Sequence, residues 1–180
     1  YMNEEFTKHY NNVFVPPAVG DEGQALGTYQ HADYVLNNNI HITETFAGKE
    51  YDYTGDERVN YKEVAQAIAD GKTVGWFQGK SESGNRALGN RSILADPRNP
   101  NIKDTINHTI KMREDFRPFA PVVLEEHYKE YFDTNSPSPY MSRICKVKTD
   151  KVPGVTHIDN TARIQTVNKE QNNKLYELIR

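Results

Sequence analysis

The chain has 180 residues, of which 36% are hydrophobic and 26% are charged, and its net charge is −3. This length is typical of one domain, or of one domain with a fragment of another. A slightly acidic chain is a poor match for nucleic acid as a main partner. A single cysteine excludes a disulfide framework, and no apolar run reaches the roughly 18 residues that a membrane span requires. We therefore expect a cytoplasmic protein without a membrane span, and the ends at Tyr1 and Arg180 suggest a piece of a longer one.

The expected elements follow from apolar periodicity and from turn residues. We expect strands over residues 13–15, 73–78, 92–95, 122–124, 140–148 and 162–167. We expect helices over residues 24–36, 61–70, 100–111 and 125–132, and a last helix that includes residues 175–179. Residues 37–60 are expected to be a loop, and residues 79–90 a loop or a short helix. Because strands and helices do not strictly alternate, the pattern predicts an α/β fold with a mixed sheet.

The charges are distributed unevenly along the chain. Residues 1–70 hold four basic and twelve acidic side chains, whereas residues 78–119 hold eight basic and five acidic ones. The change follows a polar, turn-rich stretch near residues 48–60, where we expect a domain boundary. Guanidinium groups and lysines beside glycine-rich backbone are typical of sites for phosphate or carboxylate. The basic run therefore predicts a phosphorylated small-molecule ligand.

One segment of the basic run, GNRALGNRS over residues 84–92, has the glycines of a ligand-binding loop. Its two glycines allow the backbone to approach a ligand closely, and Arg86 lies between them. The Gly-Lys-Ser/Thr placement of a nucleotide-binding P-loop is missing. Two interpretations stay open: Arg86 clamps an anion, or the segment is a solvated surface turn.

A second segment, KMREDFRPFAP over residues 111–121, places Arg117 between two aromatic residues. We expect Phe116 and Phe119 to anchor Arg117 in the core, and the two prolines stiffen the backbone around it. A stiff backbone loses less entropy when it holds a ligand. The alternative is a surface turn in which the charges pair with one another.

Four other residues invite a functional interpretation. His157 lies near Asp159, as in acid–base sites, but a histidine in a loop is more often structural. Arg163, at the start of a strand, is the better candidate for a third phosphate-binding cation. Cys145 lies in an alternating strand pattern and is expected to be a buried, inert thiol. Asp21 precedes a helix, where a carboxylate is a normal cap, and the chain lacks the histidine pairs that would complete a metal site.

Together these segments resemble the C-terminal part of the nodulation-protein-type O-carbamoyltransferases, a family that includes antibiotic carbamoyltransferases. The resemblance covers almost all of residues 61–180. It rests on GWFQG at 75–79, RALGNRSILADPR at 86–98, FRPFAP at 116–121, THID at 156–159 and TARIQTV at 161–167. Residues 16–18 and 20–27 are similar to the end of the domain that precedes this part in the family.

The resemblance implies two domains. Residues 58–180 would form a YrdC-like domain, a twisted mixed α/β sheet with flanking helices, truncated at its C-terminus. Residues 1–50 would be the remnant of a Kae1-like domain of the actin-like ATPase fold. The YrdC-like domain would bind carbamoyl phosphate and ATP, with Mg²⁺ as counter-ion, and form carbamoyl adenylate. The rest of the longer chain would then pass the carbamoyl group to a hydroxyl of a small-molecule acceptor.

The resemblance also implies roles for individual residues. Arg86, Lys111, Arg117 and Arg163 would hold carbamoyl phosphate and the nucleotide phosphates, with Lys111 and Arg117 as the catalytic pair. Further candidates for substrate or nucleotide binding are Gln78, Lys80, Asn90, Arg91 and Ser92. Asp21 would match a ligand of a divalent metal, such as iron, in the Kae1-like domain.

The chain departs from the family pattern at several points. Asn85 stands where the family usually has Pro, and Met112 stands where His often precedes Arg-Glu. The metal-binding histidines of the Kae1-like domain and the later Asn-Thr-Ser-Phe-Asn segment are absent. We therefore expect the isolated chain to be a weak or inactive catalyst.

Two other functions stay open. The first is an RNA-binding module, since YrdC-like folds can present a basic face to RNA; against it, the sequence shows no stacking aromatic residues among the cations. The second is an enzyme that makes threonylcarbamoyl adenylate from threonine and bicarbonate. The quoted segments match the carbamoyltransferase pattern better than either.

Overall fold

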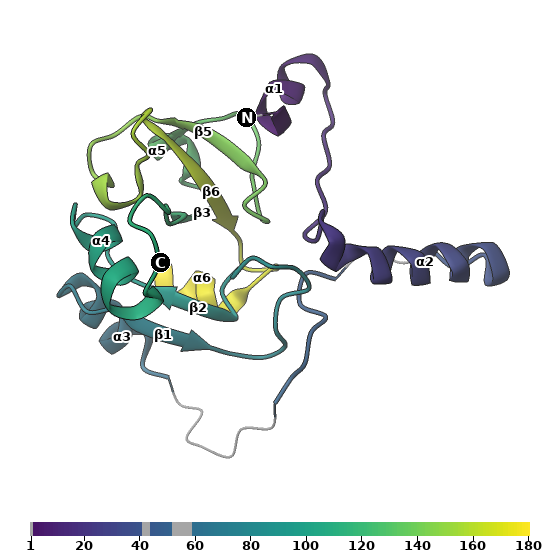
Figure 1. The fold of residues 1–180 in the computed structure, drawn as a ribbon, viewed down its shortest axis with the longest axis horizontal. Helices are drawn as coiled ribbons and strands as arrows, with labels where there is room; N and C mark the ends of the chain where they lie inside the picture. The colour runs from purple at the N-terminus through teal and green to yellow at the C-terminus, as the bar shows by residue number, and fades with distance from the viewer. Residues whose placement is uncertain (1, 41–43, 52–58) are drawn as a thin grey trace.

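The structure is a computed structural model that describes residues 2–40, 44–51 and 59–180. The described chain forms an α/β fold with a two-stranded sheet, β1-β2, and a four-stranded sheet in the order β3-β6-β5-β4 (Figure 1). The larger sheet is mixed, because β3 pairs parallel to β6 while the other two pairings are antiparallel. The predicted α/β fold with a mixed sheet and flanking helices is therefore confirmed. None of the described helices is long and apolar enough to cross a membrane.

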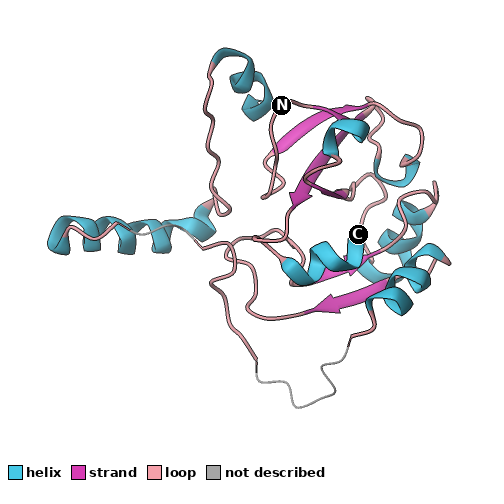
Figure 2. Ribbon diagram, turned by 180° about the vertical axis from the view of Figure 1, so that it is seen from behind, coloured by secondary structure: helices cyan, strands magenta, loops and turns pink. Residues whose placement is uncertain are grey.

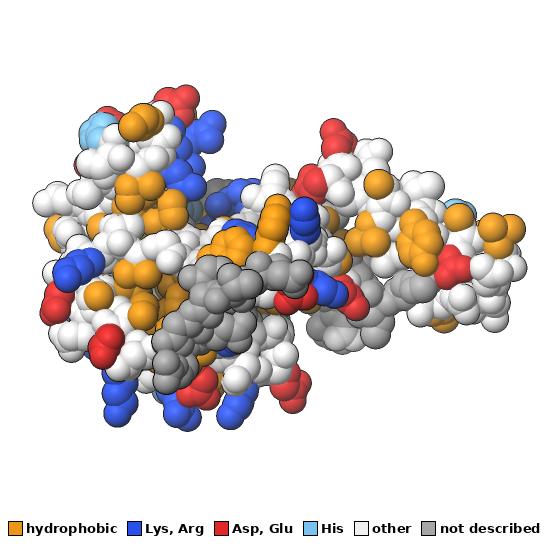
Figure 3. All heavy atoms as spheres, turned by 90° about the horizontal axis from the view of Figure 1, so that it is seen from below, with side chains coloured by type: hydrophobic (Ala, Val, Ile, Leu, Met, Phe, Trp, Pro, Cys, Tyr) orange, Lys and Arg blue, Asp and Glu red, His pale blue; other side chains and the backbone are white. Residues whose placement is uncertain are grey.

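The N-terminal region contains α1 (Met2–His9), the 3₁₀ turn η1 (Asp21–Gly23) and α2 (Gln24–Asn37). The helix predicted over 24–36 is confirmed, and it ends where Asn38 adopts a left-handed φ of 55°. Helix α2 projects from the body of the molecule, with hydrophobic side chains on its surface (Figures 1 and 3). The strand predicted over residues 13–15 is wrong, because this short extended segment pairs with no other strand of the described chain.

The smaller sheet follows α3 (Tyr61–Ala69) and consists of β1 (Val74–Phe77) and β2 (Arg91–Leu94), paired antiparallel. Asn60 caps α3, accepting a hydrogen bond from the backbone N–H of Glu63. Gly71, at a φ of 86°, lets the chain turn from α3 into β1. The predicted helix 61–70, the two strands and the loop between them are all confirmed.

The larger sheet has the long strand β6 (Thr161–Val167) between β3 (Val122–Leu124) and β5 (Arg143–Val147), with β4 (Phe132–Asp133) at the edge. One face of β6 packs into a hydrophobic core and the other borders a cavity, since successive side chains of a strand point to opposite faces. Ala162 and Ile164 are fully buried in a core with Phe132 and Cys145. Arg163 and Gln165, on the other face, line a cavity.

The remaining short helices are α4 (Ile102–Ile106), the π-helical turn η2 (Asn107–Lys111), α5 (Tyr128–Tyr131), the 3₁₀ turn η3 (Pro153–Val155) and α6 (Asn173–Ile179). The helix predicted over 100–111 therefore changes from α to π geometry at Asn107. π turns inside helices often occur at functional sites. The helix predicted over 125–132 is shorter than expected, and Phe132 already belongs to β4.

Helix α6 joins the two sheets. It lies across the smaller sheet in Figure 2, and its Leu175 packs with Leu124 and Val167 of the larger sheet and with Leu94 of β2. Burying Leu175, which is 1% exposed, stabilises the protein by about 1.5–3 kcal/mol relative to an exposed position.

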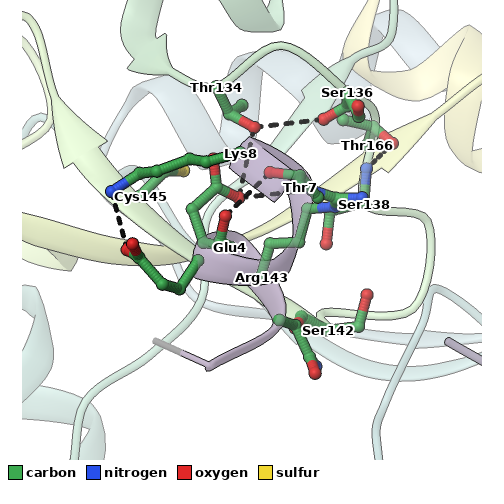
Figure 4. Close-up of polar contacts among 12 residues, drawn as sticks. Glu4, Thr7, Lys8, Thr134, Ser136, Ser138, Ser142, Arg143, Cys145 and Thr166 are labelled. Carbon is green, nitrogen blue, oxygen red and sulfur yellow. Dashed lines mark hydrogen bonds and ion pairs between the residues drawn. The ribbon is translucent and has the colours of Figure 1, made fainter. Parts of the chain in front are cut away.

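Helix α1 packs against the larger sheet through polar contacts (Figure 4). The carboxylate of Glu4 lies 3.4 Å from the guanidinium of Arg143 on β5, and Asn3 Nδ2 donates to the carbonyl of Ser142 at 2.7 Å. The N-terminal 50 residues thus contact the sheet directly. The domain boundary near residues 48–60 and the actin-like origin of residues 1–50 stay predictions.

Cys145 lies in the core at 3% exposure, as predicted. Burial raises the pKa of its thiol to about 12. Because the thiolate is the reactive form, we expect iodoacetamide at pH 8 to alkylate the folded protein at least about a thousandfold more slowly than the urea-unfolded protein. Mass spectrometry of time points measures both rates, and equal rates would show that the thiol is accessible.

Candidate functional site

A cavity of about 230 Å³ lies between the two sheets. Loop residues 85–87 and 89, strand β2, Lys111 at the end of η2, and strands β3 and β6 contribute to its walls. Five positively charged side chains are among the lining residues: Arg86, Arg91, Lys111, Arg113 and Arg163. Within the described chain, no aspartate or glutamate lines this cavity. Such a surplus of cations favours an anionic ligand, because a bound anion offsets the repulsion among them.

Arg163 is a partly buried cation on β6. Its Nε is inaccessible to solvent and has no hydrogen-bond partner within the described chain. Burial, together with the positive charge of Arg86, lowers the pKa of its guanidinium. A guanidinium stays protonated at neutral pH, so the protein holds a desolvated cation without an internal counter-ion. A buried unpaired donor costs about 1–3 kcal/mol, which a hydrogen-bonded anion would recover.

Arg86 and Lys111 line the same cavity from two different segments. Both are exposed, and neither forms a side-chain hydrogen bond or an ion pair within the described chain. The structure thus brings three of the four predicted cations, Arg86, Lys111 and Arg163, to one cavity.

Arg113 is a fourth cation at the cavity that the sequence interpretation missed. Its Nε donates to Oδ1 of the fully buried Asn107 at 2.8 Å, and its guanidinium lies 4.8 Å from the ring centroid of Phe119. Asn107 Nδ2 also donates to the carbonyl of Arg117 at 3.0 Å, so one carboxamide holds both ends of the loop. The available signal was the pair Lys111-x-Arg113, which follows Asn107 by four residues at the end of the same helical segment.

Arg117 does not line the cavity in the structure. Its Nε lies 3.1 Å from the carboxylate of Glu114, and both side chains are more than half exposed. The expectation that Phe116 anchors Arg117 in the core is wrong, because Phe116 is 79% exposed; Phe119 is half-buried. An exposed ion pair contributes only about 0–1 kcal/mol, so an anionic ligand can compete with Glu114 at little cost. The ligand-binding role of Arg117 stays a prediction.

Three other predicted binding residues, Gln78, Asn90 and Ser92, form hydrogen bonds within the segments around the cavity. Gln78 Nε2 donates to the carbonyl of Gly89 and to Asn172 Oδ1, and Asn90 Nδ2 donates to the carbonyl of Lys80. Ser92 Oγ accepts from the backbone N–H of Gly89 at 3.0 Å and lies on the cavity wall.

Arg91 lines the cavity but is already engaged. Its guanidinium donates to the backbone carbonyls of Gln78, Asn90, Lys49 and Gly79. The same group lies 3.7 Å from the ring centroid of Phe77. Lys80 is exposed and lies outside the cavity lining. A role of Arg91 and Lys80 in ligand binding stays a prediction.

The family comparison agrees with this cationic cavity. The family described as "Carbamoyltransferase C-terminus" matches residues 65–180, which include all five cations. The chain belongs to this family. The resemblance drawn from the sequence is therefore confirmed.

Several relatives align with almost the whole chain. Nodulation protein NolNO of Sinorhizobium fredii is 38% identical, over 94% of this chain and 29% of that protein. The 3'-hydroxymethylcephem-O-carbamoyltransferase of Streptomyces clavuligerus is 37% identical, over 95% of this chain and 34% of that protein. Uncharacterized protein MJ1058 of Methanocaldococcus jannaschii is 43% identical, over 95% of this chain and 32% of that protein. The chain thus spans about a third of the length of these relatives.

His157, in the part of the chain that matches the carbamoyltransferase family, lines a different cavity of about 310 Å³ next to Phe116 and Phe119. Thr161 Oγ1 donates to Asp159 at 2.6 Å, so it must accept from Nδ1–H of His157, 3.0 Å away. Nδ1 thus carries a proton, and Nε2 is buried without a partner within the described chain. The geometry supports a structural histidine.

Burial lowers the pKa of His157 below its ordinary value of 6.5, against the opposing effect of Asp159. Below pH 6.5 the unfolded chain therefore binds more protons at this position than the folded protein does. We expect the free energy of unfolding to fall as the pH drops through 6.5 towards the folded pKa. Urea unfolding at pH 7.5 and 5.5 measures this loss, which should shrink in His157→Gln. An NMR titration of His157 at or above pH 6.5 would contradict the prediction.

Asp21, which the resemblance suggests as a metal ligand, lies at the start of η1. Its carboxylate accepts a hydrogen bond from Nε2 of Gln24 at 2.9 Å. Among the residues that the structure describes, no group of three His, Cys, Asp or Glu side chains is placed to hold a metal ion. One exposed carboxylate does not fit the four-ligand site of a transition metal. A metal role for Asp21 stays a prediction.

Proposed function

We propose that this chain is the donor-activating part of an O-carbamoyltransferase, which binds carbamoyl phosphate and ATP and forms carbamoyl adenylate. The acceptor would be a small molecule with a hydroxyl group. The observation that carries the proposal is the cavity with five cations, which among the described residues has no lining carboxylate and no partner for Nε of Arg163. The name of the cephem relative, an O-carbamoyltransferase, agrees with it.

The chemistry explains why so many cations are needed. Forming carbamoyl adenylate from carbamoyl phosphate and ATP consumes one water and releases inorganic phosphate and pyrophosphate. Two polyanions must meet, and the negative charge grows on the leaving groups. Fixed cations that offset this charge lower the barrier without any side-chain nucleophile, which is consistent with the inert Cys145. Lys111 and Arg117 remain the proposed catalytic pair, with Arg117 released from Glu114.

The size of the cavity limits what it holds. Its volume of about 230 Å³ is below the roughly 300–1,000 Å³ of pockets that enclose a drug-sized ligand. We therefore assign carbamoyl phosphate and the reacting phosphates of ATP, with their Mg²⁺, to the cavity. The nucleoside would lie outside it.

The experiment is exchange of labelled pyrophosphate into ATP that depends on carbamoyl phosphate, measured with this chain and with any longer protein that contains it. The expected result is exchange that requires carbamoyl phosphate and is stronger in the longer protein. Exchange in neither protein would contradict the proposal. Exchange supported by threonine and bicarbonate instead would favour the threonylcarbamoyl adenylate enzyme.

One observation favours the RNA-binding alternative. Exposed aromatic rings do lie among cations: Arg91 stacks on Phe77, Lys49 lies 4.7 Å from the ring centroid of Tyr51, and the two rings are 6.3 Å apart. The sequence-based statement that no such rings exist is wrong. An RNA affinity that falls steeply with salt and depends on Phe77 and Tyr51 would support this alternative.

A further inference from the structure

Glu82 occupies the position that a ligand anion would take in a phosphate-binding loop. Its Oε1 accepts hydrogen bonds from three backbone N–H groups, those of Leu88 at 2.7 Å, Asn90 at 2.9 Å and Arg91 at 3.1 Å. Convergent backbone N–H groups of this kind normally surround a bound anion. The loop therefore contains an internal carboxylate, and these three N–H groups are not available to an external phosphate.

These hydrogen bonds close the segment that carries Arg86. Ser83 is fixed on one side, since its N–H donates to the carbonyl of Thr45 at 2.8 Å. On the other side, Leu88 and Asn90 are buried and bonded to Glu82. Between these anchors lie only residues 84–87, and Arg86 stands there without a side-chain partner within the described chain.

The turn that brings the loop back to Glu82 depends on Gly89. Its φ of 107° is a conformation that side chains disfavour. An added Cβ would also collide with Leu175 of α6. The loop is thus held against α6 at one side and tied to Glu82 at the other.

We propose that Glu82 is a positioning residue that holds Arg86 at the cationic cavity before any ligand arrives. The inference rests on the proposed anion-binding function of that cavity. Charge-assisted hydrogen bonds from N–H groups to a carboxylate are about twice as strong as neutral ones. Glu82 orders the loop before the ligand arrives, so that less conformational entropy is lost when the ligand binds. The negative charge of Glu82 takes the place of a phosphate within the loop, while Arg86 remains available to bind the phosphate of a ligand.

The test is a double-mutant cycle on pyrophosphate affinity, measured by calorimetry with Glu82→Ala, Arg86→Ala and the double variant of this chain. We expect each single variant to weaken binding by about tenfold, the effect of losing one charge-assisted hydrogen bond. If Glu82 acts through Arg86, the double variant binds no more than about twofold more weakly than Arg86→Ala. Additive losses would overturn the inference, because a merely structural Glu82 would weaken binding whether or not Arg86 is present.

Two controls separate the possible failures. Glu170→Ala removes an exposed carboxylate and should leave pyrophosphate affinity unchanged. Glu82→Gln keeps an oxygen acceptor without the charge and should give an intermediate loss; it replaces Glu82→Ala in the cycle if that variant does not fold. Should Arg86→Ala itself leave the affinity unchanged, the proposed role of the cavity fails. If Arg86→Ala weakens binding but the cycle shows no coupling, only the role of Glu82 fails.

Discussion

Replacing Arg163 with alanine is expected to reduce carbamoyl phosphate-dependent pyrophosphate exchange by about 10²–10³-fold, the usual effect of removing a fixed donor from a developing negative charge. Arg163 is the cation best placed for this role, since its Nε is buried and has no other partner within the described chain. The same variant should not lose stability, because it removes a desolvated charge that no carboxylate compensates. Exchange assays and thermal unfolding of the same preparation measure the two effects.

Lys146→Ala is the matched control for Arg163→Ala. Lys146 is an exposed cation on β5, beside β6, and lies outside the cavity lining. We expect it to leave exchange and stability unchanged. Equal exchange in Arg163→Ala and Lys146→Ala would show that the Arg163 guanidinium takes no part in the reaction.

Replacing Glu4 with alanine is expected to lower the free energy of unfolding by about 3–5 kcal/mol, because it leaves the guanidinium of Arg143 buried and unpaired. The two side chains are 19% and 6% exposed. For a chain of this size, such a loss lowers the melting temperature by roughly 6–20 °C. Urea unfolding and calorimetry measure the change.

Helix α1 supplies the control for this prediction. Glu5 pairs with Lys8 in the same helix, but both side chains are more than half exposed. Exposed pairs contribute only about 0–1 kcal/mol, so Glu5→Ala should change stability little. If both variants lose the same small amount, α1 is not held to the sheet by the buried pair.

Some of the site could be predicted from the sequence because it depends on residue type and local pattern. Arg86, Lys111 and Arg163 lie in separate segments, and the family resemblance was enough to predict that they meet. The strands β1, β2, β3 and β6 were also predicted, since β-branched and apolar residues mark them directly. The strands need no knowledge of long-range contacts, whereas the meeting of the three cations was predicted from the resemblance alone.

The features that were missed depend on contacts that no local pattern reveals. Arg117 is drawn away from the cavity by Glu114, three residues before it, whereas Arg113 is held at the cavity by Asn107 across a π turn. The pairing of Glu4 with Arg143 joins residues 139 apart in the sequence. The internal carboxylate of Glu82 serves its loop only because the chain folds back through Gly89.

The most direct test of the cationic cavity is a crystal structure of the protein with carbamoyl phosphate. We expect a phosphate oxygen within hydrogen-bond distance of Nε of Arg163, with Arg86 and Lys111 turned towards the same group. Carbamoyl phosphate bound elsewhere on the surface, with Nε of Arg163 still unpartnered, would show that the cavity is not its binding site.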